Sequence, residues 1–271
     1  MEEHHVLGVT KIVNWLLSKP AAALLASLHI KVQNPQYPIP NHVAMEVLVF
    51  IVAVVFFLWL KRRLSVERPG AVQQCMEMLL TNPMGLGIRD MLEDFVGHGA
   101  HRYLPVLGSI SIFILMSNLI SVVPGLESPT ATNSVPLGCA ITVFLYYNWC
   151  GVRKQGLLHY GKHFLGPVLA VSPLMVVVET VSHLARLLSL TVRLWVNMLV
   201  SELLYVTFLG LTLALFVFVG HLNPIGYLTG VLPFFGPPLF IVLHVFVGFV
   251  QAFVFTILPI IYVSGAVAEG H

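Results

Sequence analysis

Five long apolar segments constrain this chain more than any other feature of its sequence. A helix needs about 20 residues to cross the hydrocarbon core of a bilayer, which is about 30 Å thick. Charged residues make up 10% of the chain, against about 25% in soluble domains. We therefore predict an all-α integral membrane protein with about five membrane helices. The segments cover residues 43–60, 104–123, 135–151, 168–219 and 231–267.

Basic residues are concentrated in two of the loops between these segments. The loop after the first segment carries Lys61, Arg62 and Arg63, and the loop after the third carries Arg153 and Lys154. The other two loops contain no Lys or Arg. Cytoplasmic loops carry the excess of basic residues, so we predict an outer N-terminus and a cytoplasmic C-terminus. The net charge of +2 is too small to indicate a nucleic-acid partner.

The remaining residues divide the chain into an outer segment, residues 1–42, and a membrane domain, residues 43–268. Residues 61–103 mix apolar and charged side chains at helical spacing, which predicts a cytoplasmic hairpin of two amphipathic interfacial helices. The outer segment is expected to hold a similar interfacial helix, broken at Pro20.

The last two apolar segments are too long for a simple crossing. No proline interrupts residues 176–219, and a continuous helix of that length would measure roughly 66 Å at 1.5 Å per residue. Residues 231–267 are also long, although prolines punctuate them. We predict two long, steeply tilted helices beside a protein partner.

Arg193 lies within the fourth segment, among mostly apolar neighbours. A guanidinium stays charged at any cellular pH, and its transfer to the bilayer centre costs about 2.5–3.5 kcal/mol on insertion scales. Such a residue usually faces a protein interior or a water path, so Arg193 is a functional candidate.

Other polar residues of this segment follow a helical pattern around Arg193. Glu179, Arg186 and Arg193 are spaced by seven, which places them nearly on one helix face. His183 lies one turn from Glu179, and Asn197 continues the stripe after Arg193.

A second group of polar residues lies further toward the predicted outer side. Glu202 follows Ser201 on the fourth segment, whereas His244 and Gln251 are seven apart on the fifth. Glu and His exchange protons with water, and Arg does not. The hypothesis from the residues alone is two aqueous half-paths separated by a fixed positive charge, with Glu179 near the inner path and Glu202 near the outer one.

Structural alternatives remain for several of these residues. Glu179 and His183 would pair to neutralise a helix end, and Glu202 and His244 would form a structural pair, which does not exclude proton passage. Arg186 would snorkel toward the cytoplasm, and Asn197 and Gln251 would form ordinary interhelical hydrogen bonds. The spacing of His and Cys predicts no metal site, and no cofactor is expected.

Two blocks of the sequence resemble a known family. Residues 189–198 read S-L-T-V-R-L-W-V-N-M, followed by Ser201 and Glu202, and residues 251–253 read Q-A-F after His244. They are similar to subunit a, the membrane stator of rotary ATP synthases, across roughly residues 40–268. Residues 103–125 and 129–133 are similar to its second span and outer loop. Trp195, Val196 and Ser201 depart from the usual Phe, Gly and Gly.

The resemblance implies roles for the candidate residues. Arg193 would face a ring of c subunits. Glu202 and His244, with Ser201 beside them, would line an outer proton half-channel, Gln251 would lie close to Arg193, and Glu179 would belong to the cytoplasmic half-channel.

The resemblance also implies partners, and it leaves a rival open. The chain would be a non-catalytic component of the ATP synthase, with the c-ring, b subunits and bilayer as partners, in a bacterial plasma membrane. Protons are the expected coupling ion, with sodium as the alternative. The rival function is a self-contained secondary transporter with a midplane arginine.

Overall fold

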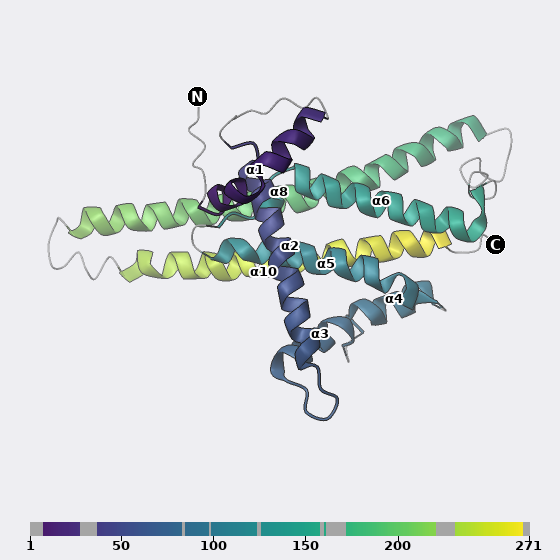
Figure 1. Cartoon of the computed structure of the whole chain (residues 1–271), viewed down its shortest axis with the longest axis horizontal. Coiled ribbons are helices and arrows are strands. Elements are labelled where there is room, and N and C mark those ends of the chain that lie inside the picture. The colour runs from purple at the N-terminus through teal and green to yellow at the C-terminus, as the bar shows by residue number, and fades with distance from the viewer. Residues whose placement is uncertain are drawn as a thin grey trace. The chain divides into compact units, whose positions relative to one another are not determined.

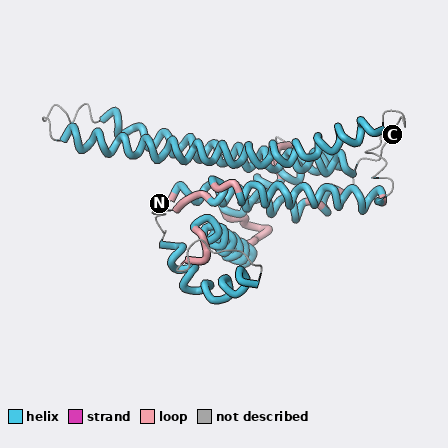
Figure 2. Tube along the Cα trace, turned by 90° about the horizontal axis from the view of Figure 1, so that it is seen from above, coloured by secondary structure: helices cyan, strands magenta, loops and turns pink. Residues whose placement is uncertain are grey.

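The computed structural model describes residues 8–27, 37–82, 85–97, 99–123, 126–157, 160, 172–220 and 231–267. Side chains are described throughout these ranges except at 21, 23–27, 215–220 and 231–237. Every regular element in the described residues is a helix (Figures 1 and 2). The α-helices are α1 (Gly8–Ser27), α2 (Asn41–Arg63), α3 (Ala71–Leu80), α4 (Ile88–Val96), α5 (Leu104–Leu119), α6 (Ser134–Gln155), α8 (Ser172–Gly220) and α10 (Val231–Val267), and the short 3₁₀ turns are η1 (Ala100–Arg102), η2 (Ile120–Val122) and η3 (Pro129–Ala131).

Five of the described helical segments are long and apolar enough to cross a membrane. This confirms the predicted fold class and the predicted number of spans. Large apolar side chains on these helices point outward, as at Phe50, Leu184 and Phe246. Exposed apolar surface of this extent suits lipid or other membrane helices rather than water. The segments are Asn41–Arg63, Leu104–Val122, Ser134–Gln155, Ser172–Ala214 and Pro238–Val267.

The last two helices are the longest in the described part of the chain. Helix α8 has 49 residues and α10 has 37, which corresponds to about 74 Å and about 56 Å at 1.5 Å per residue. The predicted continuous helix over residues 176–219 lies within α8, whereas residues 168–171 of the predicted segment lie outside the described residues.

Two helix boundaries and one proline differ from the sequence predictions. Helices α2 and α6 continue through the basic residues that follow their apolar runs, and they end at Arg63 and Gln155. Basic side chains stabilise the last turn of a helix, where the backbone dipole is negative. The predicted break at Pro20 is wrong, because α1 continues through it. A proline inside a helix removes one backbone hydrogen bond without necessarily ending the helix.

The chain divides into two compact units, each made from three stretches of sequence. The first unit draws on Met1–Trp59, Met116–Thr132 and Met198–Gly248, and the second on Leu60–Leu115, Asn133–Asn197 and Phe249–His271. Helices α2, α5, α8 and α10 therefore contribute residues to both units. Each unit contains an antiparallel contact between α8 and α10.

In the first unit, polar side chains join α1 to the segment that enters α2. The Asn14 amide donates to the Ile39 carbonyl at 3.0 Å and accepts from the Ile39 N–H at 3.0 Å. The Thr10 hydroxyl donates to Asn41 at 2.9 Å. Further along this unit, the rings of Phe208 on α8 and Phe240 on α10 stack at 3.8 Å.

In the second unit, the turn between α3 and α4 depends on a close backbone approach at Gly87. A Cβ atom there would lie 2.5 Å from the Leu80 carbonyl oxygen, so only glycine fits. The Asp90 carboxylate accepts a hydrogen bond of 2.6 Å from the Asn82 N–H and closes the turn. The predicted pair of short helices within residues 61–103 is therefore observed as α3 and α4.

Helix α10 is held in the second unit by hydrogen bonds to three other helices. Ser264 donates to the Phe95 carbonyl at the end of α4. Thr256 donates to Ser111 of α5 at 2.7 Å, and Gln155 of α6 donates to the Ala266 carbonyl at 3.0 Å. These contacts fix which face of α10 points inward in this unit.

Candidate functional site

His244 is the centre of a buried polar cluster in the first unit. Its side chain on α10 is 5% exposed. The Nδ1 atom lies 2.7 Å from Ser201 Oγ on α8, and the Nε2 atom lies 2.8 Å from Ser121 Oγ on η2. Both ring nitrogens therefore have a hydroxyl partner, and three segments of the chain meet at one imidazole.

The chemistry of this arrangement follows from its donors and acceptors. A neutral imidazole has one N–H donor and one acceptor nitrogen, and a hydroxyl both donates and accepts. Either imidazole tautomer can thus be satisfied by Ser201 and Ser121 when the two hydroxyls turn accordingly. The row Ser201–His244–Ser121 can hold a proton on either side of the ring without moving a heavy atom.

Asn118 extends the cluster toward the loop after α5. This residue is fully buried. Its amide nitrogen donates to the Gly248 carbonyl at 3.1 Å, and its amide oxygen accepts from Thr130 at 2.7 Å. Thr130 in turn contacts Ser128 at 2.6 Å between hydroxyl oxygens. Asn118 thereby ties α5, α10 and the loop into one hydrogen-bonded assembly.

Glu202 lies at the edge of the same unit and is partly buried. Its carboxylate is close to the backbone N–H of Ser128 and to the Glu127 carboxylate. In the described part of the chain it forms no ion pair with His244, whose α8 partner is Ser201 instead. Glu202 and His244, which we predicted to be neighbours, thus belong to one cluster because Glu202 directly follows Ser201, the α8 partner of His244.

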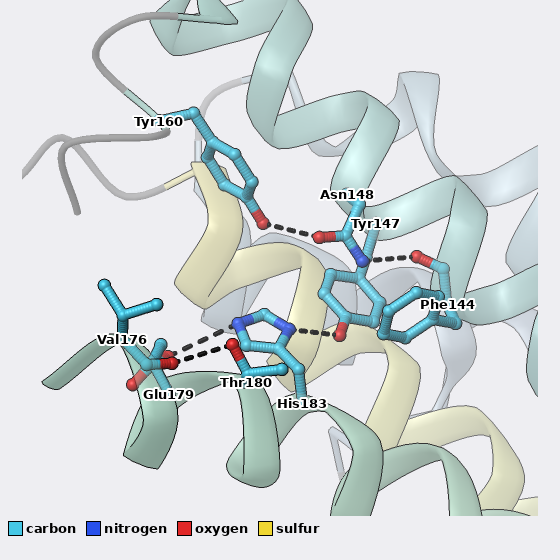
Figure 3. A network of polar contacts seen from close by, with 8 residues as sticks. All are labelled: Phe144, Tyr147, Asn148, Tyr160, Val176, Glu179, Thr180 and His183. Carbon is cyan, nitrogen blue, oxygen red and sulfur yellow. Dashed lines mark hydrogen bonds and ion pairs between the residues drawn. The ribbon is translucent and has the colours of Figure 1, made fainter. Parts of the chain in front are cut away.

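Figure 3 shows a second polar cluster, which lies in the second unit and includes Glu179 and His183 of α8. The Glu179 Oε1 atom is 3.3 Å from His183 Nε2. The Nδ1 atom of the same imidazole is 2.7 Å from the hydroxyl oxygen of Tyr147 on α6. The pairing of Glu179 with His183, one of the structural alternatives, is therefore observed, but it is part of a longer row.

Aromatic rings surround this second cluster. The Tyr262 ring of α10 lies 5.7 Å from the Tyr147 ring, and the Arg186 guanidinium lies 5.5 Å from the centre of the Tyr262 ring. A cation at this distance is attracted by the ring face. Arg186 therefore has an aromatic partner within the protein in addition to any contact with solvent.

Tyr160 and Asn148 extend the polar contacts of Figure 3 beyond α6. The Tyr160 hydroxyl donates to the Asn148 amide oxygen at 2.9 Å, and the Asn148 amide donates to the Phe144 carbonyl at 2.7 Å. Burial raises the pKa of Tyr160 above its ordinary value, because the charged form is disfavoured away from water. The Tyr160 hydroxyl therefore stays protonated near neutral pH and remains a donor.

Arg193 differs from the other candidates because its side chain is exposed. No hydrogen bond or ion pair joins it to another described residue. Asn197, one turn later, is partly buried, and Gln251 of α10 is buried at 7% exposure. Arg193 thus presents its charge at the surface of the chain.

Several residues of the two clusters are absent from the sequence-predicted site. They carry hydroxyl or amide side chains, which are common in membrane helices, so the residue type alone does not indicate a functional role. Asn118, Ser121 and Thr130 lie within blocks that resemble the family, which is the one signal in the sequence for them. Tyr147 and Tyr262 had no comparable signal. The missed residues are Asn118, Ser121, Ser128, Thr130, Tyr147 and Tyr262.

Five apolar spans together with buried polar clusters at two imidazoles define a polytopic integral membrane protein. The family model described as ATP synthase A chain matches residues 43–264. The chain belongs to this family. It is therefore a component of the ATP synthase complex and not a catalytic enzyme by itself.

Individual relatives agree with the family match. The chain is 39% identical over 267 residues to "ATP synthase subunit a" of Koribacter versatilis, which covers 98% of this chain and 99% of the relative. It is 45% identical over 234 residues to the protein of the same name from Solibacter usitatus, covering 86% and 90%. It is 36% identical over 226 residues to that of Campylobacter jejuni, covering 83% and 89%.

Proposed function

We propose that this chain is the stator subunit that gives protons two offset half-channels to a ring of c subunits. Proton flow across the membrane would then be coupled to rotation of the ring and to ATP synthesis. The observation that carries the proposal is the exposed guanidinium of Arg193, which pairs with no other described residue and lies between two buried polar clusters in the sequence of α8. The Glu179–His183 cluster precedes Arg193, and the Ser201–His244 cluster follows it.

The outer half-channel would use Glu202, Ser201 and His244. Each of these side chains accepts or donates protons, and the two hydroxyls at His244 keep its imidazole oriented. Glu202 would take protons from outer water, since its carboxylate is only partly buried. A c-subunit carboxylate protonated from this side becomes neutral and enters lipid at low cost.

The cytoplasmic half-channel would use Glu179 and His183. The side chain of Glu179 is 28% exposed and that of His183 is 10% exposed, so the row leads from a buried group to a more accessible one. A proton released by the c-subunit carboxylate would leave by this route. Asn197 and Gln251 would contribute polar side chains on α8 and α10.

Arg193 would act as a fixed charge that separates the two routes. Its positive charge favours the ionised form of a carboxylate that approaches it, and so promotes release of the proton to the cytoplasmic side. The charge also repels a proton that would pass directly from one half-channel to the other. Each proton that crosses a potential of 100 mV supplies about 2.3 kcal/mol, which biases the rotation.

The proposal assigns partners and an orientation as well. The outward-facing charge of Arg193 requires an anionic partner, which the c-ring would supply, and b subunits would complete the stator. The loop charges favour an outer N-terminus and a cytoplasmic C-terminus in a bacterial plasma membrane. Membership of the family favours this stator over a self-contained secondary transporter.

The test is Arg193→Lys in the assembled ATP synthase, reconstituted in liposomes. A lysine loses its proton more readily in a low-dielectric site than an arginine does, so the variant should lose ATP synthesis driven by a proton gradient. Arg153→Lys is the matched control, because Arg153 is exposed at the end of α6 over the Trp149 ring. Normal ATP-driven proton pumping by Arg193→Lys would reject the proposal.

A further inference from the structure

Tyr147 is a buried group that the proposed proton route does not yet use. Its side chain is 2% exposed, and its hydroxyl oxygen lies 2.7 Å from His183 Nδ1 (Figure 3). The phenol comes from α6, whereas His183 and Glu179 come from α8. A hydroxyl at this distance can donate to Nδ1 or accept a hydrogen bond from it, so the direction depends on the other partners of the imidazole.

The direction of the donor on the imidazole follows from Glu179 and Tyr147, which both contact His183. An ionised carboxylate only accepts hydrogen bonds, so a proton on Nε2 is the arrangement in which the 3.3 Å contact between Glu179 Oε1 and His183 Nε2 is attractive. The neutral ring then carries a lone pair on Nδ1, which accepts from the Tyr147 hydroxyl. The row reads Tyr147 to His183 to Glu179, with every donor aimed toward the more exposed carboxylate.

We infer that Tyr147 is a positioning residue of the cytoplasmic half-channel, which holds His183 in the Nε2–H tautomer with its donor toward Glu179. The inference rests on the proposed function, because it presumes that protons leave past His183. The hydroxyl keeps the imidazole from presenting its N–H to the buried side. Proton release is thereby directed toward the accessible carboxylate.

Packing of the ring does not require the hydroxyl. The Tyr147 ring contacts the Phe144 ring at 5.5 Å, the Tyr262 ring at 5.7 Å and the His183 ring at 5.8 Å. A phenylalanine would keep these ring contacts and lose the hydrogen bond of the hydroxyl to Nδ1, together with its interactions with Asn148 and Arg186. Tyr147→Phe therefore separates a positioning role from a packing role.

Other charged and titratable groups lie around the same imidazole. Glu179 of α8 and Tyr147 of α6 contact it directly, whereas Arg186 of α8 and Tyr262 of α10 lie next to Tyr147. Tyr160 is close enough to interact electrostatically with Tyr147, Arg186 and Glu179.

The experiment uses the whole ATP synthase in liposomes and measures ATP-driven proton pumping, with pH varied separately on each side of the membrane. We expect Tyr147→Phe to slow pumping by about two- to thirteenfold, the range set by one hydrogen bond of about 0.5–1.5 kcal/mol. The pH profile should shift when the cytoplasmic-side pH is varied and stay unchanged when the outer pH is varied. Tyr146→Phe is the matched control, because the Tyr146 ring contacts Trp149 and not His183.

A double variant tests whether Tyr147 acts through His183. Tyr147→Phe combined with His183→Gln should pump no more slowly than His183→Gln alone. An additive loss in the double variant, or a wild-type rate and pH profile in Tyr147→Phe, would overturn the inference. Should Arg193→Lys pump normally, the proposed function itself fails, whereas loss in Arg193→Lys with a normal Tyr147→Phe rejects the role of Tyr147 alone.

A measurement on the unaltered protein covers the case in which Tyr147→Phe fails to assemble. Nitrogen NMR of the ¹⁵N-histidine-labelled complex distinguishes the two imidazole tautomers, and His183→Gln identifies the signal. The Nε2–H tautomer supports the inference. The Nδ1–H tautomer contradicts it, since Nδ1 would then donate to Tyr147 and Nε2 would have no proton for Glu179.

Discussion

Replacing Ser201 by alanine removes one of the two hydroxyls that orient His244. The contact is short, at 2.7 Å between Ser201 Oγ and His244 Nδ1, and both residues are buried, at 9% and 5% exposure. After the change Nδ1 has no partner on α8, while Ser121 still holds Nε2 at 2.8 Å. The imidazole keeps its place on α10 and loses one of its two directional constraints.

The size of the effect follows from the net value of one such hydrogen bond. That value is about 0.5–1.5 kcal/mol, and a factor of ten in rate corresponds to about 1.36 kcal/mol. If proton transfer past His244 limits passive flow through the membrane sector, Ser201→Ala should slow that flow by about two- to thirteenfold. A larger loss would mean that the change disturbs more than the one contact.

The assay is passive proton flow through the membrane sector in liposomes, started by a potassium-diffusion potential. Ser109→Ala is the control, because the Ser109 hydroxyl is exposed and donates only to the Val106 carbonyl of its own helix. That variant should conduct at the wild-type rate. Equal rates for Ser201→Ala and Ser109→Ala, at equal amounts of assembled complex, would refute the role given to the Ser201 hydroxyl.

Two further changes test the packing of α6 and the outer route. Gly151→Ala would place a Cβ 2.5 Å from Tyr160 Cε2, so we expect a destabilisation of about 1–3 kcal/mol, measured as a lower melting temperature of the complex. The control is Gly138→Ala on the same helix, where a Cβ atom meets no atom within 4 Å, so the change should be neutral or stabilising by about 0.5–1 kcal/mol. If the Gly151→Ala complex were as stable as the Gly138→Ala complex, the close packing at Gly151 would be contradicted. Glu202→Gln removes a titratable carboxylate from the proposed outer half-channel and should slow passive proton flow, and an unchanged rate would exclude Glu202 from the path.

The helices could be predicted from the sequence because apolar runs are a local property. Residues 231–267 were predicted as one segment and form α10 with the same bounds. The ends of α2 and α6 were harder to predict, because hydropathy indicates which side chains tolerate lipid and does not indicate where the backbone stops being helical. Lys61 and Arg153 continue their helices because long basic side chains reach polar surroundings from the last turn.

The partners within each cluster could not be predicted from the sequence. Ser121 and His244 are separated by 123 positions, and Tyr147 and His183 by 36. Helical spacing tells which residues share a face, as it did for Glu179 and His183, but the register of one helix against another depends on packing of the whole interface. A serine or tyrosine hydroxyl becomes informative only when that register places it beside an imidazole.

The two clusters share a feature that explains how one chain can combine a fixed charge with mobile protons. In each, an imidazole is held by a neutral hydroxyl, from Ser201 and Ser121 at His244 and from Tyr147 at His183. A hydroxyl orients a ring without fixing its charge, whereas a carboxylate at every nitrogen would favour the imidazolium and trap the proton. Arg193 has the opposite property, since its charge is permanent and no described residue neutralises it. Groups that can change their protonation state can pass protons, whereas the permanent charge of Arg193 can only attract or orient an anion. This combination of residues suits the proposed stator, whose counter-charge would lie on another subunit.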